Sequence, residues 1–217
     1  MSKKVKKNSK GKKIAIFVFI ILLVLAIVGV VIYFLYFKDN KKEEGQVIEA
    51  KILNSIEEYG ITLSDMDTEL YKKEYEALKA NLESDNIDYE EYAKSISKLF
   101  VIDLYTINNK INKYDIGGYE VVYPAIVENY KLNVSDTIYR YIEDNSTGKR
   151  TQILPEVKTV TVDSIKANKY TIKSESKTYD GYKVKVKMTY VKDLGYDDEA
   201  ELIIIKIDDK LYIAEKN

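Results

Sequence analysis

Residues 14–37, a run of 24 residues without a charged side chain, constrain this chain more than any other feature. The run reads IAIFVFIILLVLAIVGVVIYFLYF, with no proline and one glycine. As a helix it would extend about 36 Å, which exceeds the hydrocarbon core of a bilayer at about 30 Å. A buried amphipathic helix would show a polar stripe, and none interrupts this run. The run therefore predicts a single transmembrane helix over 14–37.

The charges beside the run predict its orientation. Residues 1–13 contain seven lysines and no acidic residue, whereas residues 38–46 form a short linker with three lysines and three acidic residues. Because positively charged flanks stay inside, we expect a single-pass cell-membrane protein with a cytoplasmic N-terminus and an external C-terminal domain. A cleaved signal peptide is the alternative, but its apolar region is shorter, about 7–15 residues, and ends at a small-residue site. The lipid bilayer is the expected partner of the span and the basic tail.

The composition of residues 47–217 limits the function of the external part. These 171 residues are enough for one domain with a hydrophobic core. They carry 24 Lys and Arg against 32 Asp and Glu, a net charge of −8, once the ten basic and three acidic residues of 1–46 are set aside. This charge disfavours nucleic acid as a partner, because phosphate binding needs excess positive charge. The ratio of 32 Lys to 2 Arg indicates a low-GC bacterium.

The chain contains no cysteine and no histidine. Disulfides and thiol chemistry are therefore excluded, and so are the commonest general base and the commonest metal ligand. No motif for nucleotide binding, zinc-dependent hydrolysis or serine-based acyl transfer occurs. We assign no catalytic, cofactor-binding or metal-binding residue, and we expect no cofactor.

Helical periodicity dominates residues 47–142. Apolar spacing over 47–59 predicts a first helix, ended by Gly60. Later helices are expected after polar caps, a second from Ser64 or Asp65 and a third from Asp88. Pro124 fits the first turn of another, and the last would begin at Ser135 or Asp136. The expected bounds of these four are 64–82, 88–113, 124–130 and 135–142.

After Pro155 the periodicity changes to strict alternation, which is typical of strands with one buried face. Asp180-Gly181 predicts a tight hairpin turn, and Asp208-Asp209 a turn before the last strand. Strands are expected over 157–165, 169–176, 182–191, 200–207 and 210–214. Helices followed by strands predict an α+β fold, with the helices on one face of an antiparallel sheet of four or five strands across 156–215.

The order of elements over residues 66–215, including a helix with the sequence FVIDLYTINNK, resembles the nuclear-transport-factor-2-like (cystatin-like) superfamily. In that superfamily, helices pack into a curved antiparallel sheet and form a cone. A single N-terminal span before such a domain is similar to the bitopic assembly components of type IV secretion and conjugation machines. The resemblance implies a cone-like roll that works in an assembly. It assigns no functional residue, because element order rather than a diagnostic motif carries it.

Asp103 falls inside an apolar stripe rather than opposite it. It lies three residues after Phe100 and four before Ile107, on the side of the third helix expected to meet the sheet. A carboxylate there has to be paired, hydrogen-bonded, protonated or at the rim of a cavity. Arg140 is the expected partner, because a guanidinium binds a carboxylate through two parallel hydrogen bonds. The preferred interpretation is that Asp103 fixes helix packing through tyrosine hydroxyls or backbone amides.

Two charged clusters have simpler interpretations than ligand binding. The acidic residues over 197–201 lack the ordered spacing of a calcium loop and are interpreted as a solvated loop. Three alternating lysines are interpreted as the exposed face of a one-sided sheet with acidic cross-strand partners, rather than as a stripe for an anionic wall polymer. The lysines are Lys183, Lys185 and Lys187, and the expected partners are Glu175, Glu199 or Glu201.

Two classes of function follow from these observations. The leading hypothesis is a non-catalytic, membrane-anchored interaction domain of the bacterial cell envelope, whose partners are other envelope proteins. The alternative is a small-ligand-binding or enzymatic domain that uses a cavity of the cone near Asp103. A pocket of a few hundred Å³ lined by convergent polar groups would favour the alternative, and a filled core would favour the leading hypothesis.

Overall fold

The computed structural model describes residues 19, 21–33 and 48–217. The chain divides into two units, Met1–Gln46 and Val47–Asn217. Residues 21–33 are helical and exposed. The remainder of the expected span 14–37, the basic tail and the linker lie outside the described residues. Within the described ranges, none of the helices combines the length and the hydropathy that a membrane crossing requires.

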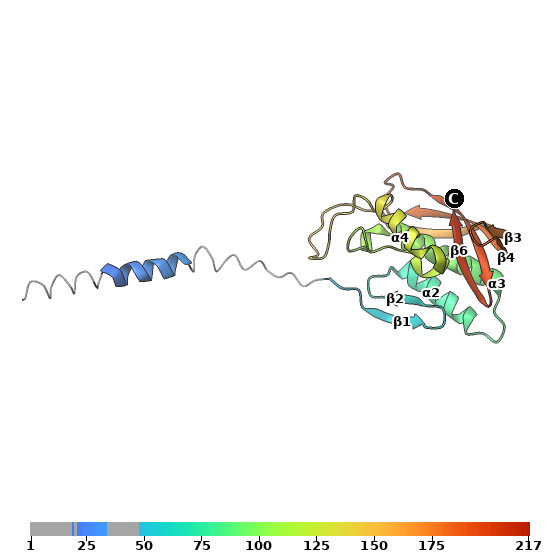
Figure 1. Ribbon diagram of the computed structural model, residues 1–217, viewed down its shortest axis with the longest axis horizontal. Coiled ribbons are helices and arrows are strands. Elements are labelled where there is room, and N and C mark those ends of the chain that lie inside the picture. Colours follow the sequence, from blue (N-terminus) through green and yellow to red (C-terminus); the bar gives the residue numbers. More distant parts are fainter. Residues whose placement is uncertain (1–18, 20, 34–47) are drawn as a thin grey trace, which may run out of the picture. The chain divides into compact units, whose positions relative to one another are not determined.

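Three α-helices belong to the second unit (Figure 1). Two of them begin at side-chain caps that satisfy the free N–H groups of a first turn. The Thr68 hydroxyl accepts from Tyr71 N–H at 3.2 Å, and the Asp88 carboxylate accepts from two N–H groups of the next turn. The predicted start at Asp88 is confirmed, while the second helix begins after Thr68 rather than after Ser64 or Asp65. The bounds are α2 Glu69–Leu82, α3 Tyr89–Tyr105 and α4 Val127–Asp136.

The expected last helix over 135–142 is wrong, because residues 135 and 136 close α4 instead of opening a new helix. The chain then forms turns through residue 141. The third helix is also shorter than predicted. It ends at Tyr105, and a single 3₁₀ turn, Ile107–Asn109, follows it. Residues 107–121 are therefore mostly loop with short 3₁₀ turns, and they run back along the end of α3.

The expected first helix over 47–59 is wrong as well. Strands β1, Ile52–Ile56, and β2, Ile61–Ser64, form a separate antiparallel hairpin there. Gly60 closes its turn at φ 69°, which glycine adopts without a steric penalty. The apolar spacing of this stretch fits both periodicities, and packing decides between them, because Ile56, Ile61 and Leu63 are buried in the core.

Four antiparallel strands form the main sheet in the order β3–β4–β5–β6. Helix α3 contacts all four strands and also packs on α2, so α3 lies between α2 and the sheet (Figure 1). Side chains from both layers, such as Ile96 and Val184, are fully buried between them. The predicted α+β fold with helices on an antiparallel sheet is confirmed. The strands are β3 Val157–Ile172, β4 Lys177–Tyr190, β5 Glu199–Ile207 and β6 Lys210–Lys216.

Strands β3 and β4 form one long hairpin, so the predicted turn at Asp180-Gly181 is wrong. Both residues lie inside β4, and Gly181 pairs with Asn168 on one side and Ile205 on the other. A Cβ at Gly181 would lie 1.9 Å from the carbonyl oxygen of Ile204. Glycine inside a strand often marks such a close approach of two backbones. The predicted turn at Asp208-Asp209 between the last two strands is confirmed.

The three alternating lysines form ion pairs on the exposed face of the sheet. The pairs are Lys183–Glu201 at 2.6 Å, Lys185–Glu199 at 3.2 Å and Lys187–Asp163 at 2.9 Å. Two of the three expected acidic partners are therefore correct. Such exposed pairs contribute little to stability. The lysine stripe is largely neutralised within the chain itself.

Gly181→Ala is expected to lower the free energy of unfolding by about 2–4 kcal/mol, because the added methyl group meets rigid backbone. Urea unfolding of the full-length chain, followed by tyrosine fluorescence, measures the loss. Gly195→Ala is the matched control. Its φ is 77° but no atom lies within 4 Å of an added Cβ, so it should cost only about 1 kcal/mol. Equal losses for the two variants would contradict the close approach of β4 and β5.

Candidate functional site

Asp103 lies in the last turn of α3 and is bound on both carboxylate oxygens. Lys110 Nζ donates to Oδ1, and the Gly118 N–H donates to Oδ2 at 2.6 Å. The side chains of Asp103 and Lys110 are 18% and 8% exposed. The carboxylate is therefore paired and largely buried, which is one of the four arrangements expected for it. A backbone amide is one of its two partners, and the charged partner is a lysine rather than Arg140.

Arg140 is not the partner of Asp103. It is exposed in the turn after α4, and its guanidinium lies 5.3 Å from the ring centre of Tyr141. The prediction failed because the helix that was to carry Arg140 does not form. The other arginine, Arg150, is the one that organises a loop, since it donates to the carbonyls of Lys110 at 2.8 Å and Asn108 at 2.7 Å.

The Gly117-Gly118 pair brings this loop against α3. A Cβ at Gly117 would lie 2.1 Å from the Asp103 carbonyl oxygen, and one at Gly118 would lie 2.8 Å from the Phe100 ring. Gly118 also has φ 77°, a conformation that side chains disfavour. Tyr130 OH donates to the Gly117 carbonyl at 2.6 Å. These contacts join the loop and α4 to the end of α3.

Three further carboxylates surround the pair: Asp67, Asp115 and Glu120. Glu120 accepts from the Thr62 N–H at 2.9 Å and from its hydroxyl at 2.7 Å, so it joins β2 to the loop. Burial raises the pKa of Glu120, and the bonds from Thr62 partly oppose this shift. Burial and the Asp103 charge likewise raise the pKa of Asp67.

Lys110 balances this concentration of negative charge. Burial alone would lower the pKa of Lys110, but the neighbouring charge and hydrogen bond of Asp103, aided by Asp115 and Asp67, raise it overall. The ammonium group therefore stays charged at neutral pH. All the contacts of this cluster join segments of the chain to one another, which is a structural rather than a chemical arrangement.

A cavity of about 370 Å³ lies elsewhere, between α3, α4 and β6. It adjoins a second hollow of about 520 Å³, the trough, which is lined in part by residues 170–174 at the β3–β4 hairpin. Ile126, Ala214 and Glu215 line both spaces. Asp103 lines neither space, so these two spaces are not the cavity that was expected near Asp103. We call the two adjoining spaces the β6 groove.

Sequence reasoning found Asp103 but missed Lys110, Glu120 and the β6 groove. Lys110 follows the end of α3, where helical spacing no longer relates it to Asp103. The groove is built by segments far apart in the sequence, and only the burial of its apolar residues was foreseeable. Within the described residues, no group of three acidic side chains is arranged to hold a metal ion.

No protein-family model matches this sequence, and neither a curated protein nor a solved structure matches it. The geometry therefore has to carry the functional argument. It provides one structural charge cluster around Asp103 and one open groove beside β6.

The Asp103–Lys110 contact predicts a strong energetic coupling. Asp103→Asn keeps an acceptor for the Gly118 N–H but leaves a buried ammonium group without its counter-charge, so unfolding free energy should fall by about 3 kcal/mol. Lys110→Met should cost a similar amount. The double variant removes both charges and should recover about half of the summed loss. Urea unfolding measures all three, and strictly additive losses would contradict a direct buried pair.

Glu120 predicts a specific dependence of stability on pH. Its pKa in the folded chain is raised above the ordinary value of about 4.3. Between that pH and the folded pKa, the folded chain binds more protons than the unfolded chain. The free energy of unfolding therefore falls as the pH rises through this range, and it stays lower at higher pH. Glu120→Gln abolishes this loss. Its stability relative to the native chain should therefore increase as the pH rises above about 4.3 and level off once the pH passes the folded pKa of Glu120.

Urea unfolding at a series of pH values measures this difference. Glu128→Gln is the control, because the Glu128 side chain is 90% exposed. Its stability curve should run parallel to that of the native chain. A parallel curve for Glu120→Gln would show that burial does not raise the pKa of Glu120.

Proposed function

We propose that this chain is a non-catalytic interaction domain of a bacterial cell envelope, anchored in the membrane by residues 14–37. The β6 groove is the observation that carries the proposal. It leaves apolar side chains such as Ile126 and Ile138 open to a partner. The charged groups around Asp103, by contrast, are engaged in holding the fold together, and Asp103 lines neither part of the groove.

The relation to the nuclear-transport-factor-2-like superfamily and the cone-like shape of the sheet are part of this proposal. The order of helices and strands supports them. The anchor is supported by the length and hydropathy of the run over 14–37, and the external placement of the domain by the seven lysines before that run. Other envelope proteins are the proposed partners.

A small-ligand-binding domain is the second candidate. A volume of about 370 Å³ is within the range of small-molecule pockets and supports this reading. The polar groups of such a site would have to converge on the ligand, however, and the Asp103 cluster lies outside the lining. We therefore prefer the interaction domain.

Labelling of single cysteines tests the anchor, because the chain has no cysteine of its own. Lys192→Cys lies at an exposed position of the domain, and Ser2→Cys lies in the basic tail. A membrane-impermeant maleimide added to intact cells should label the first variant and not the second. Both should react after permeabilisation. Labelling of Ser2→Cys alone would reverse the orientation, and labelling of neither in intact cells would place the domain inside.

Crosslinking in intact cells tests the interaction. An amine-reactive bifunctional reagent should convert the tagged full-length chain, of 25.1 kDa, into discrete larger species that contain a second protein. Exposed lysines are abundant on the domain, so the reagent has sites to react. A chain that stays at its own mass at every reagent concentration would contradict an interaction domain.

A further inference from the structure

We propose that the β6 groove binds an extended, uncharged segment of a partner polypeptide, with one large apolar side chain inserted between α4 and β6. This inference rests on the proposed function and names the chemistry of the partner. Three features of the groove lead to it: its apolar floor, two free amides on α4, and the open edge of β6.

The floor of the groove suits a single large apolar side chain. The cavity between α3, α4 and β6 holds about 370 Å³. Its walls include Phe100, Leu104, Val134 and Ile213, which are themselves buried and belong to the core. Ile126 and Ile138, also in the lining, are only half-buried. An aliphatic or aromatic side chain in this space would leave water itself and cover the apolar surface that these two residues still expose.

The rim of the cavity carries two unpaired amides. Asn129 and Asn133 are four residues apart on α4, so they lie on one face of the helix, and both line the cavity. Both are exposed, and within residues 48–217 neither side-chain amide has a hydrogen-bond partner. An asparagine amide offers a donor and an acceptor together. That pair matches the N–H and C=O groups of an extended peptide backbone.

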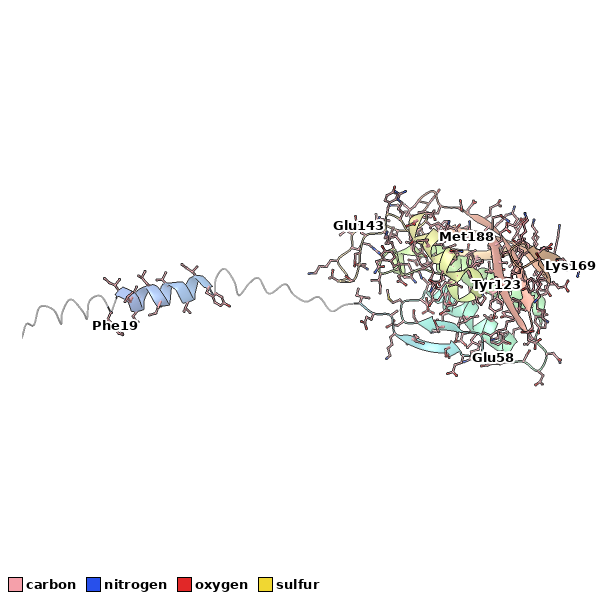
Figure 2. The ribbon with its side chains drawn as sticks, viewed as in Figure 1. Phe19, Glu58, Tyr123, Glu143, Lys169 and Met188 are labelled. Atoms are coloured by element: carbon pink, nitrogen blue, oxygen red, sulfur yellow. The ribbon has the colours of Figure 1, made fainter. Side chains whose placement is uncertain are left out.

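The edge of β6 is covered only in part. Val122 forms a parallel bridge with Ile213, and the Tyr123 N–H donates to the Ile213 carbonyl at 2.9 Å. Tyr123 is labelled in Figure 2. Pro124 follows, and it lacks an N–H and begins a 3₁₀ turn, so the pairing ends there. Beyond this point the groove continues past Ala214 to the trough beside Tyr170. An extended chain could occupy both adjoining spaces and lie along the uncovered part of the β6 edge.

The charges in the groove favour an uncharged segment. Glu215 accepts a hydrogen bond from Tyr170 OH at 2.5 Å, and Lys216 Nζ lies 3.7 Å from Asp197. Asp197 therefore offsets the charge of Lys216, whereas Glu215 keeps its negative charge because tyrosine is a neutral donor. Lys173, at the hairpin turn, is the remaining charged side chain of the trough. Its positive charge offsets that of Glu215, so the groove has no net charge and suits an uncharged segment. A fatty acid needs a cation beside the cavity itself, where Lys216 is already paired with Asp197, so we favour a peptide.

The test uses the full-length chain reconstituted in nanodiscs, with empty nanodiscs to remove lipid-binding clones. The probe is a phage-displayed library of random peptides of roughly nine residues, about 30 Å when extended. Enriched peptides should be uncharged with one large aliphatic or aromatic residue. Fluorescence anisotropy then measures the affinity of an enriched peptide and of the same peptide with that residue replaced by alanine, which should bind at least about tenfold more weakly.

Two groove variants and one control locate the site. Ala214→Phe obstructs the junction of the cavity and the trough and should weaken binding at least about tenfold. The double variant Asn129→Ala/Asn133→Ala changes only exposed side chains and should weaken binding about threefold to about thirtyfold through lost hydrogen bonds. Ala167→Phe is the matched control, because Ala167 is exposed and lines a different cavity, beside Tyr89. It should bind as the native chain does.

The remaining outcomes overturn the inference. No enriched peptide, enrichment of charged peptides, or equal binding by the asparagine double variant would exclude an extended uncharged segment at this groove. Saturable binding of myristate that Ala214→Phe abolishes, without peptide enrichment, would assign the groove to an acyl chain. If cellular crosslinking yields complexes that Ala214→Phe leaves intact, the interaction domain stands and this groove is not its site. If the native chain forms no crosslinked complex in cells, the proposed function itself is refuted.

Discussion

The path of the chain after α3 depends on one buried carboxylate. Asp103 binds Lys110 with one oxygen and the Gly118 N–H with the other. The segment between them has little regular structure, so its polar groups need partners of this kind. These two contacts fix the segment, which then places Glu120 against β2 and Val122 against the edge of β6. One side chain thus connects the central helix with both sheets.

The sequence was sufficient to identify Asp103 but not its surroundings. A carboxylate inside an apolar stripe has to be satisfied, whatever the fold. The identity of its partner depends on where a loop returns, and helical spacing says nothing about that. Arg140 was the better choice on chemical grounds, because it binds carboxylates in a fork. The structure leaves it in an exposed turn, and Lys110 takes the role from seven residues along the chain.

The same contrast applies to the fold. Local sequence signals were sufficient where neighbouring residues determine the secondary structure. Examples are Asp88 at the start of α3 and the alternating side chains along β4. They failed where tertiary packing decides. The apolar residues over 47–59 suit a helix or a hairpin equally well, and Gly181 allows a tight turn or a close approach of two strands. The β6 groove was beyond reach, because residues from four separate segments form it.

The position of the β1–β2 hairpin has a mechanical consequence. The Ile48 N–H first donates to the Ser146 carbonyl at 2.9 Å, and the chain then reaches the open end of the hairpin, where Lys51 bonds Asp65 and Ile52 pairs with Ser64. A pull transmitted along residues 1–46 would therefore break the ladder one pair at a time, which is the weakest way to load a hairpin. Glu120 resists at Thr62. Release of residues 48–64 would lengthen the tether by up to about 55 Å. It would also uncover the part of the core that Ile56, Ile61 and Leu63 fill. If residues 14–37 anchor the chain as we propose, a load on residues 1–46 reaches this hairpin before it reaches the four-stranded sheet.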